Sequence, residues 1–185
     1  MMNNKTKQMT ETAVMTAVLC ILGPLTIPIG PVPVSLAPLA ILLSVYILGT
    51  FKGTMSVILY LLVGAFGLPV FSGFQGGFAK IAGPTGGFLL GYIFLALTAG
   101  IFIEKFYDRL IPQFLGMCLG LAALYFFGTV WLVCGAGMGF MEALMVGVVP
   151  FVLIDLVKMA FAVFLGRAVN SRLDKAGMNM RKKSS

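Results

Sequence analysis

The stretch VGVVPFVLIDLVKMAFAVFL, Val146 to Leu165, decides the fold class of this chain. It is apolar apart from Asp155 and Lys158, and it has the length of about 20 residues that a helix needs to cross a bilayer. Each charge placed at that depth costs roughly 2.5–3.5 kcal/mol on insertion scales. Because the two residues are three apart, they lie on one face of a helix. We interpret them as an opposite-charge pair inside the membrane and as the first candidate site for a polar ligand.

The composition is typical of an integral membrane protein. Of the 185 residues, 59% are hydrophobic and 10% are charged, whereas a soluble domain carries about 25% charged residues. We expect one all-α membrane domain, residues 1–185, with a helical bundle over about residues 10–168 and a basic cytoplasmic tail over residues 169–185. The chain has no histidine, no metal-binding cysteine spacing, and no P-loop, HExxH or GxSxG motif. We therefore expect neither an enzyme nor a metal site or cofactor.

Six apolar segments are expected to form transmembrane helices. They are approximately Thr12–Ile27, Leu36–Gly49, Thr54–Phe66, Phe88–Ile103, Phe114–Val133 and Val146–Leu165. With six crossings, every Lys and Arg of the chain except Lys80 and Lys158 falls on the same side of the membrane. The positive-inside rule therefore places both termini in the cytoplasm. The basic tail then lies beside anionic lipid, so its charge does not indicate a nucleic-acid partner.

Three segments on the predicted outer side are apolar, although loops exposed to water are normally polar. They are Gly23–Pro38, Gly67–Gly87 and Cys134–Leu144. The first is stiffened by prolines, and the second is rich in glycine and phenylalanine. Non-helical backbone near the membrane is tolerated where it is buried in protein or lines a cavity. We expect these loops to fold over the mouth of the bundle and to pack there.

The last predicted helix enters the membrane from the outer side. Asp155 then lies roughly 13 Å deep, at 1.5 Å per residue. Side chains on a helix lean toward its N-terminus, so Lys158 reaches back toward the turn that holds Asp155. Both charges would meet in a cavity that opens to the outer side. The alternative is a structural ion pair that holds two helices together.

The outer loop Gly67–Gly87 is the second candidate part of the site. Ser72, Gln75 and Lys80 are interleaved there with phenylalanines such as Phe74. Aromatic walls with a few directed polar groups are typical of a small-molecule site, while the alternative is an interfacial loop with an aromatic belt. Tyr92, one turn into the next helix, adds a hydroxyl to the site or serves as an interfacial anchor.

The first predicted helix carries Ala13 and Ala17 at the small-xxx-small spacing that permits close helix packing. This spacing alone is a weak indication of an interface, since alanine is common in membrane helices.

Three stretches closely resemble the BioY family: GLPVFSGFQGGFAKIAGPTGGFLLGY (67–92), GPLTIPIGPVPVSLAP (23–38) and DLVK (155–158). Members are biotin-specific substrate-binding (S) subunits of energy-coupling factor transporters, and the resemblance covers about residues 9–168. It implies the six-helix bundle of such an S component and a high-affinity biotin site that faces outward. It also implies partners, a transmembrane T subunit and two ATPase subunits. In that fold family an AxxxA motif on the first helix contacts the T subunit, and Ala13 and Ala17 match it.

We therefore expect biotin uptake across a prokaryotic cell membrane by an ATP-driven importer. The ureido ring of biotin has two N–H donors and a carbonyl acceptor, so Asp155 would accept from the nitrogens while Lys158 donates to the oxygen. The bicyclic ring would lie against Phe and Tyr side chains, with the carboxylate nearer the mouth, within reach of Ser72, Gln75 or Lys80. The alternative is a stand-alone carrier or channel that uses Asp155 and Lys158 as a proton or ion site, although the chain shows no matching halves.

Overall fold

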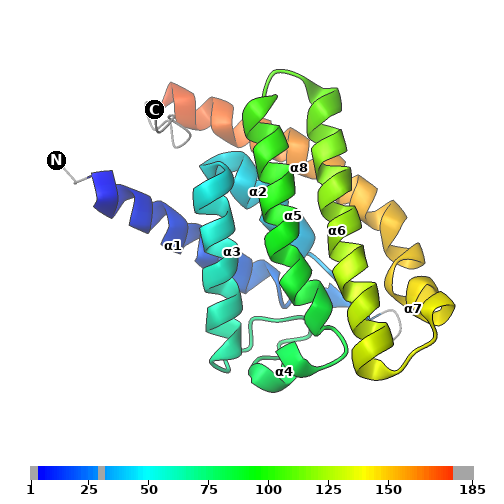
Figure 1. The fold of residues 1–185 in the computed structure, drawn as a ribbon. Helices are drawn as coiled ribbons and strands as arrows, with labels where there is room; N and C mark the ends of the chain where they lie inside the picture. Colours follow the sequence, from blue (N-terminus) through cyan, green and yellow to red (C-terminus); the bar gives the residue numbers. More distant parts are fainter. Residues whose placement is uncertain (1–3, 29–31, 177–185) are drawn as a thin grey trace.

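The structure, a computed structural model, describes residues 4–28 and 32–176 and is mainly helical (Figure 1). Its elements in chain order are α1 (Asn4–Leu22), β1 (Thr26–Ile27), β2 (Val34–Ser35), α2 (Ala37–Leu48), α3 (Thr50–Ala65), α4 (Phe78–Ala82), α5 (Gly86–Lys105), α6 (Leu110–Ala136), α7 (Phe140–Gly147) and α8 (Val149–Lys175). The prediction of a helical fold is confirmed. Within the described residues, the short antiparallel pair of β1 and β2 is the departure from an all-α structure.

Among the described residues, three helical stretches are long and apolar enough to cross a membrane. They are Gly86–Lys105, Leu110–Ala136 and Phe140–Lys175, the last of which α7 and α8 share. Helices α2 and α3 are also apolar but shorter. Six crossings and the side on which the termini lie stay predictions.

Helix α2 lies at the centre of the bundle, where it packs against α1, α3, α5 and α8 (Figure 1). Its neighbours approach closely because they carry glycine at the contact points. A Cβ atom on Gly53 of α3 would lie 2.8 Å from Val45 Cα, and one on Gly166 of α8 would lie 2.6 Å from Tyr46 Cγ. Small residues let helix backbones come together in a membrane. They hold α8, which carries Asp155, directly against the core of the bundle.

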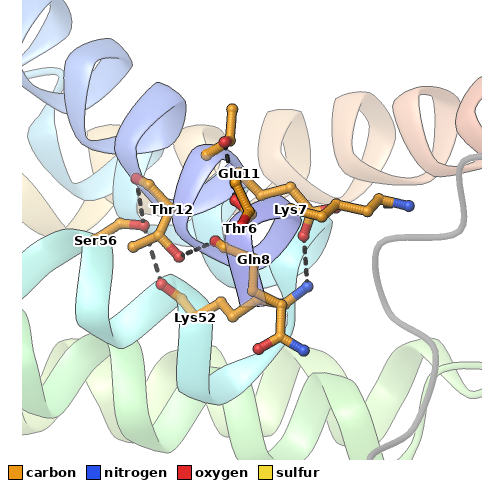
Figure 2. Close-up of polar contacts among 8 residues, drawn as sticks. Thr6, Lys7, Gln8, Glu11, Thr12, Lys52 and Ser56 are labelled. Atoms are coloured by element: carbon orange, nitrogen blue, oxygen red, sulfur yellow. Dashed lines mark hydrogen bonds and ion pairs between the residues drawn. The ribbon is translucent and has the colours of Figure 1, made fainter. Parts of the chain in front are cut away.

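Helix α1 is joined to α3 by a polar seam, which Figure 2 shows in close-up. Lys52 Nζ lies 2.7 Å from Glu11 Oε2. Ser56 Oγ donates to the Thr12 carbonyl oxygen over 3.2 Å, and Thr16 Oγ1 donates to the Ser56 carbonyl oxygen over 3.3 Å. Polar bonds between helices stabilise their association in a membrane. One face of α1 is therefore used for packing within the bundle.

The helix predicted over Val146–Leu165 is interrupted, which corrects the prediction. Helix α7 ends just before Val148, whose φ of −127° and ψ of −58° separate it from α8. Pro150 in the first turn of α8 explains the break, because proline lacks an N–H and is tolerated at a helix start but not in a helix interior. Helix α8 then continues to Lys175, so the first part of the predicted tail is helical. Residues 177–185 of that tail lie outside the described residues.

The first predicted helix, Thr12–Ile27, is also shifted. Helix α1 begins at Asn4 and ends at Leu22, because Pro24 disfavours helical backbone at the residue before it. The chain then forms β1, in which Thr26 pairs with Ser35 of β2. The strand pair brings this outer segment back toward the start of α2.

The outer loop between α3 and α5 is anchored by aromatic side chains. Phe71 is fully buried and packs edge-on against Tyr60, with ring centroids 5.6 Å apart. Tyr60 Oη donates to the Val70 carbonyl oxygen over 3.0 Å, and the Gly77 amide donates to the Gly64 carbonyl oxygen over 2.7 Å. The loop therefore packs on the end of the bundle, as its apolar composition predicts.

Substitution of Gly64 by alanine should lower the thermal stability of the protein. The new Cβ would lie 2.1 Å from Phe71 Cζ, so the ring must leave its place under the loop. Such overpacking typically costs about 1–3 kcal/mol. The measurement is the melting temperature of the purified protein in detergent.

Gly135→Ala is the matched control, because its Cβ would meet nothing closer than Trp131 Nε1 at 3.5 Å. Alanine has the higher helix propensity, so this variant should melt at or above the wild-type temperature. Equal melting temperatures for Gly64→Ala and Gly135→Ala would contradict the packing described for Phe71.

Candidate functional site

Helices α4 and α7 lie at one end of the bundle (Figure 1). A cavity lies at this end, with Lys80 of α4 and Gly147 of α7 in its lining. Its walls come from the β2 strand, the α4–α5 region, α6 and α8. Its polar lining consists of Ser35, Ser72, Lys80, Thr85, Tyr92, Tyr125, Asp155 and Lys158, and its apolar lining includes Val32, Phe88, Leu89, Leu124 and Phe151. It is narrow, with a volume of about 40 Å³. Apolar walls with a few convergent polar groups are typical of a small-molecule site.

Asp155 and Lys158 of α8 are the oppositely charged pair in this polar lining. Lys158 Nζ lies 2.7 Å from Asp155 Oδ1, and the two residues are 7% and 3% exposed. Buried charges are costly unless they are paired and hydrogen-bonded. The i, i+3 ion pair predicted from the sequence is therefore present, with both residues on the wall of one cavity.

Each member of the pair also bonds another element. Lys158 Nζ donates to the Ser35 carbonyl oxygen of β2 over 2.7 Å, and Tyr125 Oη of α6 donates to Asp155 Oδ2 over 2.7 Å. The two charged residues therefore cross-link α8 to β2 and to α6, in addition to lining the cavity. The two interpretations of the pair, as a ligand site and as a structural link, are compatible in this geometry.

Three of the predicted residues outside α8 line the same cavity. Ser72 comes from the outer loop, Lys80 from α4 and Tyr92 from α5. Burial lowers the pKa of the Lys80 ammonium from its ordinary value. Lys80 also lines a neighbouring outer recess, which contains Gln75 and Thr85. Gln75 thus lies next to the cavity and not on its wall.

Phe74 lies elsewhere. Its backbone has a positive φ of 57°, and its side chain is 64% exposed. It lines a groove on the side of the bundle together with apolar residues such as Ile154 and Phe161, and Lys158 lines this groove as well. The sequence placed Phe74 beside Ser72 and Gln75, but the turn at this residue directs it away from them.

Sequence reasoning missed Tyr125, Ser35 and Thr85. Tyr125 is the single tyrosine of α6, and a hydroxyl within an apolar run was a usable signal. Ser35 acts through its backbone carbonyl oxygen. Every residue has this group, so the sequence gives no signal for the contact. Thr85 stands immediately before α5 in the stretch GPTGG, where it reads as a helix cap.

Ala13 and Ala17 are both exposed on α1. They lie away from the face that carries Glu11, Thr12 and Thr16, which packs within the bundle. Val14 and Ile21 are also exposed on this helix, so the exposed surface is apolar with two small residues.

Among the described residues, no cluster of three His, Cys, Asp or Glu side chains could hold a metal ion.

Comparison with known proteins places the chain in a family. The model of the BioY family matches residues 1–175. A protein of Pyrococcus horikoshii named probable biotin transporter BioY is 35% identical over 87% of this chain and 94% of its own length. Biotin transporter BioY2 of Lactococcus lactis subsp. cremoris is 34% identical over 91% of this chain and 93% of its own length.

A solved structure extends the similarity to the fold. It is the crystal structure of the S-component for biotin from an ECF-type ABC transporter, which is 31% identical to this chain. The two superpose with a TM-score of 0.83 over 92% of this chain and 95% of that one. By its sequence and its fold, the chain belongs to the BioY family.

Proposed function

We propose that the chain is the biotin-binding S component of an energy-coupling factor importer. The observation that carries this proposal is the buried Asp155–Lys158 pair on the wall of a cavity, in a chain whose relatives are named biotin transporters. The distribution of Lys and Arg supports six crossings by α1, α2, α3, α5, α6 and α8, with both termini cytoplasmic. The cavity then opens to the outer side of the cell membrane.

The ureido ring of biotin is proposed to bind at the charged pair. Asp155 already accepts bonds from Lys158 and Tyr125, and a carboxylate has about four lone-pair sites, so it can accept from ureido N–H groups as well. The Lys158 ammonium has three N–H donors. Two of them bond Asp155 and Ser35, and the third can donate to the ureido oxygen.

The rest of the ligand is proposed to extend toward the mouth of the cavity. The bicyclic ring would contact Tyr92 and the phenylalanines of the apolar lining. The carboxylate would lie near Lys80 and Ser72, with Gln75 within reach from the adjacent recess. Phe74 lines the side groove, which Lys158 also lines, so the predicted contact between Phe74 and the ligand would be made from that groove. Since the cavity is narrow, the surrounding side chains must shift to admit biotin.

The proposed partners are a transmembrane T subunit and two ATPase subunits. The chain carries no nucleotide-binding motif, so ATP hydrolysis must come from other subunits. The exposed Ala13 and Ala17 would let a helix of the T subunit approach α1 closely. The resolved packing of α1 on α3 leaves this face available for such a contact.

Asp155→Asn and Lys158→Ala should each weaken biotin binding by more than about a hundredfold. Loss of one partner from a buried charge pair costs several kcal/mol, and 1.4 kcal/mol corresponds to tenfold. Isothermal titration with biotin measures the effect. Asp174→Asn and Lys175→Ala are matched controls, because both residues are exposed on the same helix.

Two outcomes would contradict the proposed orientation of biotin in the cavity. Asp155→Asn binding within a few-fold of wild type would remove the ureido ring from the charged pair. If Lys80→Ala alone weakens binding, the ligand lies at the outer loop and the Asp155–Lys158 pair is structural.

Proteoliposomes that contain only this chain should bind biotin but should not accumulate it under a proton gradient. Accumulation should require the T and ATPase subunits together with ATP, because this chain has no energy source of its own. Uptake of radiolabelled biotin measures both conditions. Gradient-driven accumulation by the chain alone would instead favour a stand-alone carrier.

Ala13→Leu with Ala17→Leu should reduce co-purification with the T subunit and leave biotin affinity unchanged. Leucine at these positions holds a partner helix away from the α1 backbone. Ala122→Leu, at an exposed position of α6, is the matched control. Full co-purification of the double variant would place the T-subunit contact on another helix.

A further inference from the structure

The hydroxyl of Thr85 is buried and unused. Thr85 is the N-cap residue of α5, a position where threonine normally accepts a hydrogen bond from a backbone N–H of the first turn. Here the side chain makes no capping bond. Among the described residues, Thr85 Oγ1 has no hydrogen-bond partner, and it is closed off from solvent. A buried hydroxyl without a hydrogen-bond partner destabilises the folded protein. The Thr85 hydroxyl therefore does not serve stability.

The position of Thr85 points to a ligand. The residue lines the cavity that holds Asp155 and Lys158, and it also lines the recess that holds Gln75. Lys80 lines both spaces as well. Thr85 and Lys80 therefore stand together at the junction between the deep cavity and its outer side.

The backbone around Thr85 is fixed on α6. Trp131 Nε1 donates to the Gly83 carbonyl oxygen over 2.9 Å, and the Gly86 amide donates to the same oxygen over 2.9 Å. A Cβ atom on Gly87 would lie 2.3 Å from Trp131 Cβ, so α5 begins in direct contact with α6. Residues on both sides of Thr85 are thus held in place.

Two other buried threonine hydroxyls also have no partner among the described residues, those of Thr54 in α3 and Thr129 in α6. Neither residue lines the cavity or the recess. An unpaired hydroxyl by itself is therefore not a sign of binding in this protein. Thr85 differs from the other two because the residue lines both the cavity and the recess.

We propose that Thr85 is a ligand-contacting residue whose hydroxyl donates a hydrogen bond to the carboxylate of the ligand, beside the Lys80 ammonium. A hydroxyl donor next to an ammonium matches a carboxylate, which only accepts hydrogen bonds. The inference rests on the proposed function, in which the ureido ring occupies the Asp155–Lys158 pair. Thr85 then helps to select ligands with a free carboxylate at the outer end.

Titration of Thr85→Val with biotin and with biotin methyl ester tests this inference. Valine keeps the shape of threonine but removes the donor, so biotin affinity should fall by about tenfold or more. Affinity for the methyl ester, which has no carboxylate, should change little. Thr85→Ser keeps the hydroxyl and should bind biotin within a few-fold of wild type. The ligand-free Thr85→Val protein should melt at or above the wild-type temperature, because an unpaired buried hydroxyl has been removed.

Thr54→Val and Thr129→Val are matched controls and should leave both affinities unchanged. Biotin binding by Thr85→Val equal to that of wild type would overturn the inference and leave the proposed function standing. An equal loss for biotin and its methyl ester would also overturn it, since the contact would then be to another part of the ligand. A lower melting temperature with weak binding in both Thr85→Val and Thr85→Ser would assign Thr85 a structural role instead. A wild-type protein that binds no biotin would overturn the proposed function itself.

Discussion

The Lys158 ammonium lies 2.7 Å from Asp155 Oδ1 and 2.7 Å from the Ser35 carbonyl oxygen, and the cavity end of the bundle is organised around it. An ammonium at this depth in an apolar helix must be paired and hydrogen-bonded. One partner comes from its own helix and the other from β2, while Tyr125 of α6 completes the shell of Asp155. Three elements that are distant in sequence therefore meet at one point, and the cavity is the space that their side chains leave between them.

Close packing around α2 is what allows this meeting. Gly166 brings α8 onto Tyr46, and Gly53 brings α3 onto Val45. In lipid, apolar side chains gain little by leaving their surroundings, so shape and small residues decide which helices associate. Farther along α8, Asn170 Nδ2 donates to the Tyr46 carbonyl oxygen over 2.8 Å. The same two helices are thus joined by packing and by a polar bond, and the charged pair is presented from a firmly held helix.

The outer segments differ in how they are held. The loop between α3 and α5 is fixed by Phe71 beneath Tyr60 and by Trp131 on Gly83. The strand pair depends on polar bonds: Ser35 Oγ donates to the Gly23 carbonyl oxygen over 3.0 Å, while Lys158 binds the Ser35 carbonyl oxygen. In the proposed function, the ligand would take a hydrogen bond from the same ammonium that holds β2. Ligand binding and the position of this strand would then be linked through one side chain.

A helical membrane protein could be predicted from the sequence, because long apolar segments are a property of the chain read in order. The sequence also determined the ion pair, since an i, i+3 spacing on a helix leaves the two side chains adjacent. The tertiary fold was needed to show that Tyr125 and Ser35 complete the pair and that Phe74 faces the side groove. The reason is physical: contacts between residues far apart in the chain depend on how each helix is rotated and how closely its neighbours approach. No local pattern carries that information.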